Sequence, residues 1–205
     1  MYLSVLRYTP DISTHARNYQ DRVQTICETG FYVKGAAERV CEATTEWSGV
    51  DPSCLIRMCP AVNELQDGEV SLTKGTEFGS KVAFECDEGF YLVGGDAAGE
   101  ASAECIEDAA NPNLGKWSAH PPTCKVRDCG TLPPPEVVGG RKEDAPASKT
   151  ILVGGGVGEG ETVYKASAEF ACHEGYDLND SSRKSTCLAS GKWSGKAGKC
   201  AIKVR

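Results

Sequence analysis

The stretch from Cys59 to Cys124 decides the fold of this chain, because its few landmarks recur elsewhere in the sequence. The landmarks stand in a polar, glycine-rich background, and in order they are Cys59-Pro60, Phe84-Glu85-Cys86, Gly89-Phe90-Tyr91-Leu92, Cys105, Trp117-Ser118, Pro122 and Cys124. Taken alone, the stretch is a small unit stapled by disulfides. Comparison with the rest of the chain makes it the middle copy of a repeat.

Internal self-similarity is the strongest signal in the sequence. An aromatic or aliphatic residue, a cysteine, an acidic or polar pair, a glycine and an aromatic residue occur in this order in three segments, so that Ile26 is matched with Phe84 and Phe170: Ile26-Cys27-Glu28-Thr29-Gly30-Phe31, Phe84-Glu85-Cys86-Asp87-Glu88-Gly89-Phe90 and Phe170-Ala171-Cys172-His173-Glu174-Gly175-Tyr176. In all three copies a tryptophan stands seven residues before a cysteine, at Trp47, Trp117 and Trp193. Bridges of four residues, 55–58 and 125–128, join the last cysteine of one copy to the first cysteine of the next.

The cysteine content indicates the redox compartment. Eleven cysteines occur among 205 residues, no Cys-x-x-Cys is present, and the three histidines, His15, His120 and His173, are scattered. Nothing marks these cysteines as metal ligands, so we expect disulfides and an oxidising compartment. The net charge of −7 argues against a general binder of nucleic acids or acidic membranes. No apolar run approaches the ~20 residues that cross a bilayer.

The local pattern predicts β-structure. Runs such as Lys81–Cys86 and Lys165–Phe170 are short, rich in β-formers and bounded by glycines. Units of about 60 residues bury too little surface to be stable without staples. Two disulfides in a unit would each add roughly 2–4 kcal/mol. One tryptophan and two aromatic residues in each unit would supply the small core.

The combined pattern of cysteines, Phe-x-Cys-x-x-Gly-Phe-x-Leu, Gly-x-Trp-Ser and Pro-x-Cys resembles the sushi module, also called the complement control protein module or short consensus repeat. The resemblance covers about residues 20–200. It implies an all-β fold, an elongated string of small disulfide-stapled modules in tandem. The residues alone leave three connectivities open for four cysteines. The resemblance implies that the first cysteine bonds the third and the second bonds the fourth.

Carried onto this sequence, the resemblance implies five bridges: Cys59–Cys105, Cys86–Cys124, Cys129–Cys187, Cys172–Cys200 and Cys27–Cys54. It also implies that Trp117 and Trp193 pack on the second bridge of their modules and that Trp47 lies beside Cys27–Cys54. Cys41 has no partner, because residues 1–26 contain no cysteine. Either the first module is truncated, which is the reading we favour, or Cys41 is free or bonded to another chain.

We divide the chain into four segments on this basis. Residues 1–54 are an N-terminal segment with a truncated module that has three cysteines, 55–124 a complete module, 125–200 a module with a glycine-rich insertion, and 201–205 the start of a further linker. We call the first three the first, second and third repeats. The start of the chain is a poor secretory signal, so we expect a fragment, a processed product or a sequence with an incomplete 5′ end.

Three features of the third repeat are candidates for function. The spacing between Cys129 and Cys172 is 42 residues, against 26 in the second repeat, and the excess falls in the glycine-rich segments 139–146 and 154–160. The region 139–160 is either a recognition loop or a solvated insertion. Asn179 begins an N-glycosylation sequon. After Asp180 every charged residue is basic, which predicts either an anion or glycan patch or a solvated face: Arg183, Lys184, Lys192, Lys196, Lys199, Lys203 and Arg205.

No pattern in the sequence predicts catalysis. The glycines at 154–160 lack the spacing of a phosphate-binding loop, and no nucleophile elbow is present. So small a core leaves no room for a catalytic pocket. We therefore expect no enzyme activity, no cofactor and no metal.

The leading functional hypothesis is a non-catalytic protein-binding or adhesion protein, or the ectodomain fragment of one, with tandem sushi modules on a rod-like scaffold. The alternative is a structural or assembly subunit of a larger complex, and a third reading is the accessory region of a secreted complement-type protease. Expected partners are a protein ligand, neighbouring subunits or a sulfated glycan, and the expected location is secreted, at a cell surface or in another oxidising lumen. Apolar residues of the bridges would set the angle between modules: Leu55, Ile56, Met58 and Val126.

Peptide mapping of the native protein without reduction tests the pairing. We expect the five bridges named above, and Cys41 outside all of them. A Cys59–Cys86 or Cys86–Cys105 peptide would contradict the family resemblance.

Overall fold

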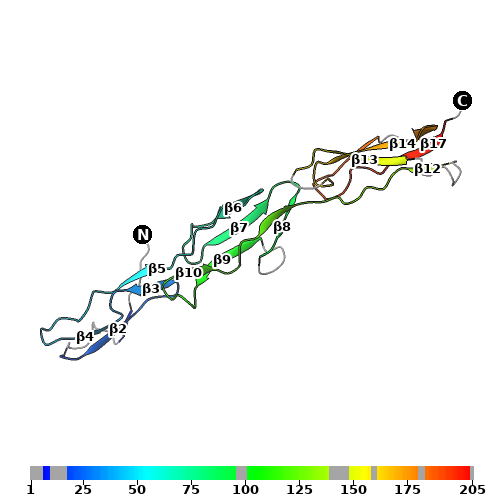
Figure 1. Cartoon of the computed structure of the whole chain (residues 1–205). Coiled ribbons are helices and arrows are strands. Elements are labelled where there is room, and N and C mark those ends of the chain that lie inside the picture. The colour runs from blue at the N-terminus through cyan, green and yellow to red at the C-terminus, as the bar shows by residue number, and fades with distance from the viewer. Residues whose placement is uncertain are drawn as a thin grey trace. The chain divides into compact units, whose positions relative to one another are not determined.

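The computed structural model of the chain describes residues 7–9, 18–95, 101–138, 148–157, 161–179 and 183–203 (Figure 1). All the regular secondary structure assigned in these residues is β-strand, and no helix is assigned among them. The first repeat contains β1 (Arg7–Thr9), β2 (Arg22–Ile26), β3 (Phe31–Lys34), β4 (Glu38–Val40) and β5 (Ser53–Ile56). The second contains β6 (Gly68–Leu72), β7 (Lys81–Cys86), β8 (Phe90–Val93), β9 (Ser102–Glu107), β10 (Gly115–Trp117) and β11 (Thr123–Val126). The third contains β12 (Glu136–Val138), β13 (Ser148–Gly154), β14 (Ser167–Cys172), β15 (Tyr176–Asn179), β16 (Lys184–Thr186) and β17 (Lys199–Ile202).

The chain divides into two compact units. One comprises Met1–Glu64, Val70–Phe84 and Gly94–Pro122, and the other comprises Leu65–Glu69, Glu85–Val93 and Thr123–Arg205. Each unit therefore contains an outer repeat and part of the second repeat. The contact between the first and second repeats lies within the first unit, and the contact between the second and third lies within the other.

Each repeat contributes strands to two sheets. The strand orders are β1-β2-β4 and β3-β5 in the first repeat, β10-β9-β7-β6 and β11-β8 in the second, and β13-β14-β16 and β12-β17-β15 in the third. The pairing of β12 with β17 is parallel, whereas β13–β14, β14–β16 and β15–β17 are antiparallel. The repeats thus share one plan, as their shared sequence pattern predicts.

Alternating burial explains the central strands β2, β7 and β14. In β7 the side chains of Val82 and Phe84 are buried and their neighbours in the strand are more exposed, which is the period of a half-buried strand. The inward position is therefore two residues before the cysteine that follows the strand's buried positions, which is Cys86 in the second repeat and Cys27 in the first. In the first repeat that position holds the buried Thr25, while Ile26 is 48% exposed. Matching Ile26 with Phe84, as the sequence comparison did, was wrong by one residue, and a shift of one residue exchanges the two faces of a strand.

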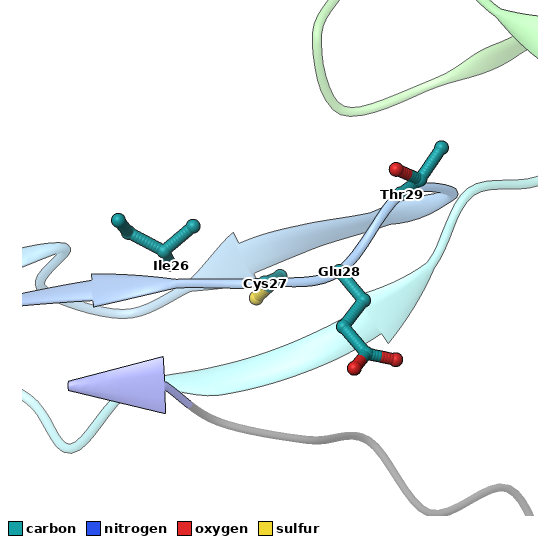
Figure 2. A pocket seen from close by; sticks show the side chains of 4 residues that line it. All are labelled: Ile26, Cys27, Glu28 and Thr29. Carbon is teal, nitrogen blue, oxygen red and sulfur yellow. The ribbon is translucent and has the colours of Figure 1, made fainter.

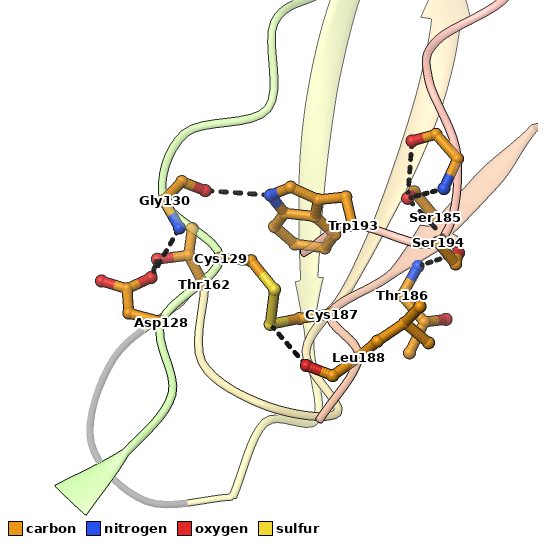
Figure 3. The surroundings of a disulfide bond; sticks show 11 residues. Asp128, Cys129, Gly130, Thr162, Ser185, Thr186, Cys187, Leu188, Trp193 and Ser194 are labelled. Carbon is orange, nitrogen blue, oxygen red and sulfur yellow. Dashed lines mark hydrogen bonds between the residues drawn. A yellow bond between two sulfur atoms is a disulfide. The ribbon is translucent and has the colours of Figure 1, made fainter. Parts of the chain in front are cut away.

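Figure 3 shows the surroundings of one disulfide. The structure contains Cys27–Cys54, Cys59–Cys105, Cys86–Cys124, Cys129–Cys187 and Cys172–Cys200, the pairs implied by the family resemblance. Cys41 is a buried free thiol.

Trp117 and Trp193 lie beside the first bridge of their repeats and not beside the second as expected, whereas the position of Trp47 beside Cys27–Cys54 stays a prediction. Trp117 is paired across the sheet with Cys105, and isolated bridges pair Trp47 with Cys41 and Trp193 with Cys187. Each indole is partly buried. Trp193 lies beside Cys129–Cys187, the first bridge of its repeat, and its Nε1 donates to the Gly130 carbonyl at 3.0 Å (Figure 3). The reason is strand register: the segment that contains the tryptophan pairs antiparallel with the segment that contains Cys41, Cys105 or Cys187.

Replacing Val82 with alanine tests the core of the second repeat. Val82 is fully buried, so the loss of two methyl groups should reduce the free energy of unfolding by about 1–3 kcal/mol. Urea unfolding followed by Trp117 fluorescence, with Trp47 and Trp193 replaced by phenylalanine, measures it. The matched control is Leu114→Ala at an exposed position of the same repeat, with an expected change within about 0.5 kcal/mol. Equal losses for the two variants would contradict this assignment of the core.

Candidate functional site

A hollow in the first unit is the first candidate for a ligand site. It has a volume of about 460 Å³, and the described residues that line it are Ile26, Cys27, Glu28 and Thr29. Figure 2 shows that the Glu28 side chain points to the opposite side of the chain from Ile26 and Thr29. Cys27 is held in a disulfide. The polar groups do not converge, and binding sites for small molecules depend on such convergence. In the described parts of the chain, no group of three His, Cys, Asp or Glu side chains is placed to hold a metal ion.

The contact between the first and second repeats is the more informative site. The turn after Cys27 has a positive φ at Gly30, and a Cβ added there would overlap the ring of Phe78 from the second repeat. The backbone of Arg57 joins the two sides: its N–H donates to the Gly30 carbonyl at 2.8 Å, and its carbonyl accepts from the Phe78 N–H at 3.0 Å. Only glycine supplies both the left-handed turn and the space for the ring.

The Arg57 side chain reinforces this contact. It is 13% exposed, and one of its terminal nitrogens lies 2.9 Å from a carboxylate oxygen of Glu107 and also donates to the Phe31 carbonyl. Its Nε donates to the Pro112 carbonyl at 2.8 Å. The Gly30 N–H in turn donates to the Glu107 carboxylate at 3.1 Å. The Arg57 guanidinium therefore ties Phe31, at the start of β3 in the first repeat, to Glu107 and Pro112 of the second repeat. Charge-assisted bonds of this kind are the stronger ones.

The second and third repeats meet through the same backbone pattern. The Arg127 N–H donates to the Gly89 carbonyl at 2.8 Å, and the Arg127 carbonyl accepts from the Tyr164 N–H at 2.9 Å. A Cβ on Gly89 would overlap the Tyr164 ring. Here the guanidinium carbon of Arg127 lies 5.2 Å from the centre of the Tyr91 ring, which is a cation–π contact.

Tyr164 is the ionisable group at this second junction. Burial, the nearby negative charge of Glu88 and a hydrogen bond to that carboxylate raise the pKa of Tyr164 above its usual value. The neutral phenol is therefore favoured in the folded state. Its contribution to stability is present below the usual tyrosine pKa and is lost as the pH rises through the raised value.

The apolar bridge residues that the sequence analysis expected to set the angle between modules are exposed or half-buried. Leu55 and Met58 are exposed, and Ile56 and Val126 are half-buried as the last residues of β5 and β11. The chain joins repeats through the third residue of each bridge, Arg57 or Arg127. The missed signal was the arginine at the same place in both bridges, together with an aromatic residue near the start of each following central strand.

The third repeat has an open sheet face. The register pairs Ile151 with Glu169 and Glu169 with Lys184, so these three side chains share a row on the outward face of β13, β14 and β16. Ile151 and Val153 are 41% and 56% exposed. Strand β13 therefore crosses the region 139–160 that the sequence analysis treated as a loop, because the run 149–153 is rich in β-formers. The segments 139–147 and 158–160 lie outside the described residues.

The basic residues near the end of the chain do not form one uniform patch. Lys184 pairs with Glu169 at 2.6 Å, Lys199 with Glu136 at 3.6 Å and Lys203 with Asp177 at 3.4 Å. Arg183, Lys192 and Lys196 are exposed. Asn179 is an exposed residue at the end of β15, and the rest of its sequon and Arg205 lie outside the described residues. Glycosylation of Asn179 stays a prediction.

Comparison with known proteins places the chain in a family. The family described as Sushi repeat (SCR repeat) matches residues 4–54, 59–124 and 149–200. The chain belongs to the sushi family. Its repeats are sushi modules, and the glycine turns and stapled sheets described above are this chain's version of them. No helix in the described residues is long and apolar enough to span a membrane.

The relatives are longer proteins. The chain is 34% identical to E-selectin of Equus caballus over 178 residues, which is 85% of this chain and 25% of that protein. It is 30% identical over 200 residues to the mouse (Mus musculus) protein named Sushi, von Willebrand factor type A, EGF and pentraxin domain-containing protein 1, covering 94% of this chain and 5% of that protein. Identity to membrane cofactor protein of Bos taurus is 29% over 169 residues, 80% of this chain and 41% of that protein. The chain spans less than half the length of these relatives.

Replacing Arg57 with alanine tests the first junction. Removal of the guanidinium leaves the Phe31 and Pro112 carbonyls and the Glu107 carboxylate without this donor, and hydrogen bonds to charged groups contribute about 1.5–3 kcal/mol. We expect the Gly30 amide to exchange its hydrogen about tenfold faster or more, as measured by NMR. Arg22→Ala, which removes an exposed arginine from β2, is the control and should leave that rate unchanged. Equal exchange rates in both variants would show that Arg57 does not hold the junction.

Proposed function

We propose that the chain is a non-catalytic binding segment that recognises a protein ligand in adhesion, through surface side chains of stapled sushi modules on a rod-like scaffold. The observation that carries this proposal is the open face of β13, β14 and β16, where Ile151 and Val153 stand exposed beside the Glu169–Lys184 ion pair. An apolar centre with charged neighbours is typical of protein contact surfaces.

The family supports the same proposal. The match to sushi repeats over most of the chain is consistent with a binding segment or a spacer between other domains. The relatives named E-selectin and membrane cofactor protein are consistent with a location at a cell surface. The disulfides support an oxidising environment, either secreted or at a surface. The domain boundaries at 54, 124 and 200 remain part of this proposal. The other readings are a spacer subunit of a larger complex and the accessory region of a secreted protease.

A sulfated glycan is a second candidate ligand. The observation that favours it is the run of basic residues after Asp180, of which Arg183, Lys192 and Lys196 are exposed. The carboxylate partners of Lys184, Lys199 and Lys203 oppose it, because they reduce the local positive charge. We therefore propose a protein ligand first and a sulfated glycan second.

Binding of multivalent protein to cells tests the proposed face. The biotinylated chain is assembled on labelled streptavidin, since four copies raise a weak affinity to a measurable avidity, and staining of a panel of cell lines is measured by flow cytometry. We expect the double variant Ile151→Ser with Val153→Ser to reduce staining about tenfold or more, the loss expected when exposed contact residues are removed. The matched control changes two exposed leucines of the second module, Leu72→Ser with Leu114→Ser, and should stain like the wild type.

Two outcomes would contradict the proposed face. Equal staining by the two double variants would exclude Ile151 and Val153 as the contact. Loss of staining after heparinase treatment, reproduced by Lys192→Ala with Lys196→Ala, would assign binding to a sulfated glycan instead.

A further inference from the structure

Strand β13 forms one edge of the sheet β13-β14-β16. The Phe170 N–H donates to the Arg183 carbonyl, so the backbone of Phe170 faces β16 and the backbones of its two neighbours in β14 face β13. The strand register pairs those two neighbours with Lys149 and Ile151. Lys149 and Ile151 are therefore the residues of β13 whose backbone groups hydrogen-bond to β14.

The alternate residues of β13 face the outer side of the sheet. Ser148, Thr150 and Leu152 direct their N–H and C=O groups away from β14, because successive residues of a strand point these groups to opposite sides. In the parts of the chain that the structure describes, these groups have no backbone hydrogen-bond partner. A row of unpaired backbone groups at a sheet edge is ready to pair with another strand.

The side chains of β13 do not protect this edge. On β6, an edge strand of the second repeat, the exposed positions include Glu69, and charged side chains are one means by which sheet edges are kept apart. On β13 the exposed positions are Ile151 and Val153. The run 150–157 contains no charged residue. Backbone and side chains of β13 therefore both favour pairing.

The length of the regular edge determines how a second strand can pair with it. The register between β13 and β14 shifts between Leu152 and Gly154, and the φ angles of Gly154 and Gly155 are +84° and +85°. An irregularity of this kind bends the strand and interrupts its ladder. The regular edge therefore comprises residues 148–152, with Thr150 at its centre.

This edge is complementary to a second copy of itself. When two copies of 148–152 run antiparallel with Thr150 opposite Thr150, Ser148 of each copy lies opposite Leu152 of the other. Every one of these pairs joins residues whose backbone groups face outward, so each pair can exchange two hydrogen bonds. The two Ile151 positions become diagonal neighbours on the outward face, at a distance that larger side chains can span.

Charge complementarity supports the same pairing. Within one copy the outward row runs from Lys184 through Glu169 to Ile151. The antiparallel pairing places position 149 of the second copy, which is a lysine, next to Ile151 in that row. Glu169 then has a lysine position on each side of it in the row, and opposite charges on one sheet face favour association.

We propose that two copies of this chain associate through β13, which pairs antiparallel with itself around Thr150 and joins two β13-β14-β16 sheets into one. The contact uses the same surface on both copies, so it closes at a dimer. The segment 148–152 gives a small interface, and the expected dissociation constant is on the order of 0.1 mM. On a surface that carries many copies, the high local concentration would favour the dimer. The inference does not depend on the ligand-binding face proposed above.

Sedimentation equilibrium tests the dimer at protein concentrations from about 10 μM to 1 mM, the range set by that dissociation constant. We expect a monomer–dimer equilibrium for the wild type. Thr150→Pro removes the N–H at the centre of the contact, and proline is tolerated where the N–H of an edge strand faces outward. This variant should weaken the dimer about tenfold or more. The control is Thr150→Ala, which keeps the N–H and removes a hydroxyl without a described partner, and it should dimerise like the wild type.

A second variant makes the test independent of proline. Ile151→Lys, at an exposed position, places a lysine opposite Lys149 of the other copy, and like charges directly opposite one another destabilise paired strands. This variant should also weaken the dimer about tenfold or more. Leu72→Lys adds the same charge at an exposed position of β6. It is the matched control and should leave the dimer unchanged.

Amide hydrogen exchange measured by NMR locates the contact. The amides of Thr150 and Leu152 should exchange about fourfold more slowly at 1 mM than at 10 μM, which is the ratio of the monomer fractions for that dissociation constant. The amide of Leu72 in β6 should exchange at the same rate at both concentrations.

Three results would each overturn the proposal: a wild type that stays monomeric to about 1 mM, a Thr150→Pro chain that dimerises like the wild type, or protection that does not include Thr150 and Leu152. A monomeric wild type whose staining of cells is lost in Thr150→Pro and kept in Thr150→Ala would assign the edge to a strand of the ligand instead.

Discussion

The paired disulfides are the constraint on which the rest of this structure depends. A module of about 60 residues buries too little apolar surface to fold by packing alone, and the largest fully buried side chains are small: Val82, Cys105, Cys187, Cys200, Ser80 and Ser185. Bridges such as Cys59–Cys105 and Cys86–Cys124, with sequence separations of 46 and 38 residues, restrict the unfolded chain instead. Because cystines replace much of the core, the outward sheet faces can vary without loss of the fold. This freedom lets Ile151 and Val153 stand exposed on a stable strand.

The glycine turn converts the fold of one module into contact with the next. Gly30 and Gly89 are required by the turn itself, since their φ values of +86° and +88° are strained for other residues. The same missing side chain leaves the space into which Phe78 and Tyr164 fit. A substitution at either glycine would therefore strain the turn and displace the ring together. Glycine therefore allows both the left-handed turn and the contact with the next module. A glycine followed by an aromatic residue shortly after Cys27 or Cys86 indicates both features.

Much of the fold could be predicted from the sequence, and the junctions could not. The repeat, the strands and the cysteine pairs follow from landmarks whose spacing is visible along the chain. The positions of Trp117 and Trp193 depend on strand register, which the spacing between a tryptophan and the next cysteine does not determine. The sequence analysis matched Ile26, and not Thr25, with the inward position because it compared residue types and did not follow the two-residue period of the strand. Arg57 and Phe78 are far from Gly30 in sequence, so only the folded chain reveals that they share one contact.

The two junctions between repeats use the same backbone contact with different side-chain contacts around it. Both use the same two backbone hydrogen bonds, from an arginine N–H to a glycine carbonyl and from an aromatic N–H to the arginine carbonyl. The side chains differ: Arg57 pairs with Glu107, whereas Arg127 lies over Tyr91 and Tyr164 bonds Glu88. A backbone pattern that tolerates different side chains can be repeated along a tandem chain, and the side chains then set the strength of each contact. The shared pattern needs only a ring at the edge of one module and a glycine turn at the edge of its neighbour, and the surrounding side chains are free to differ.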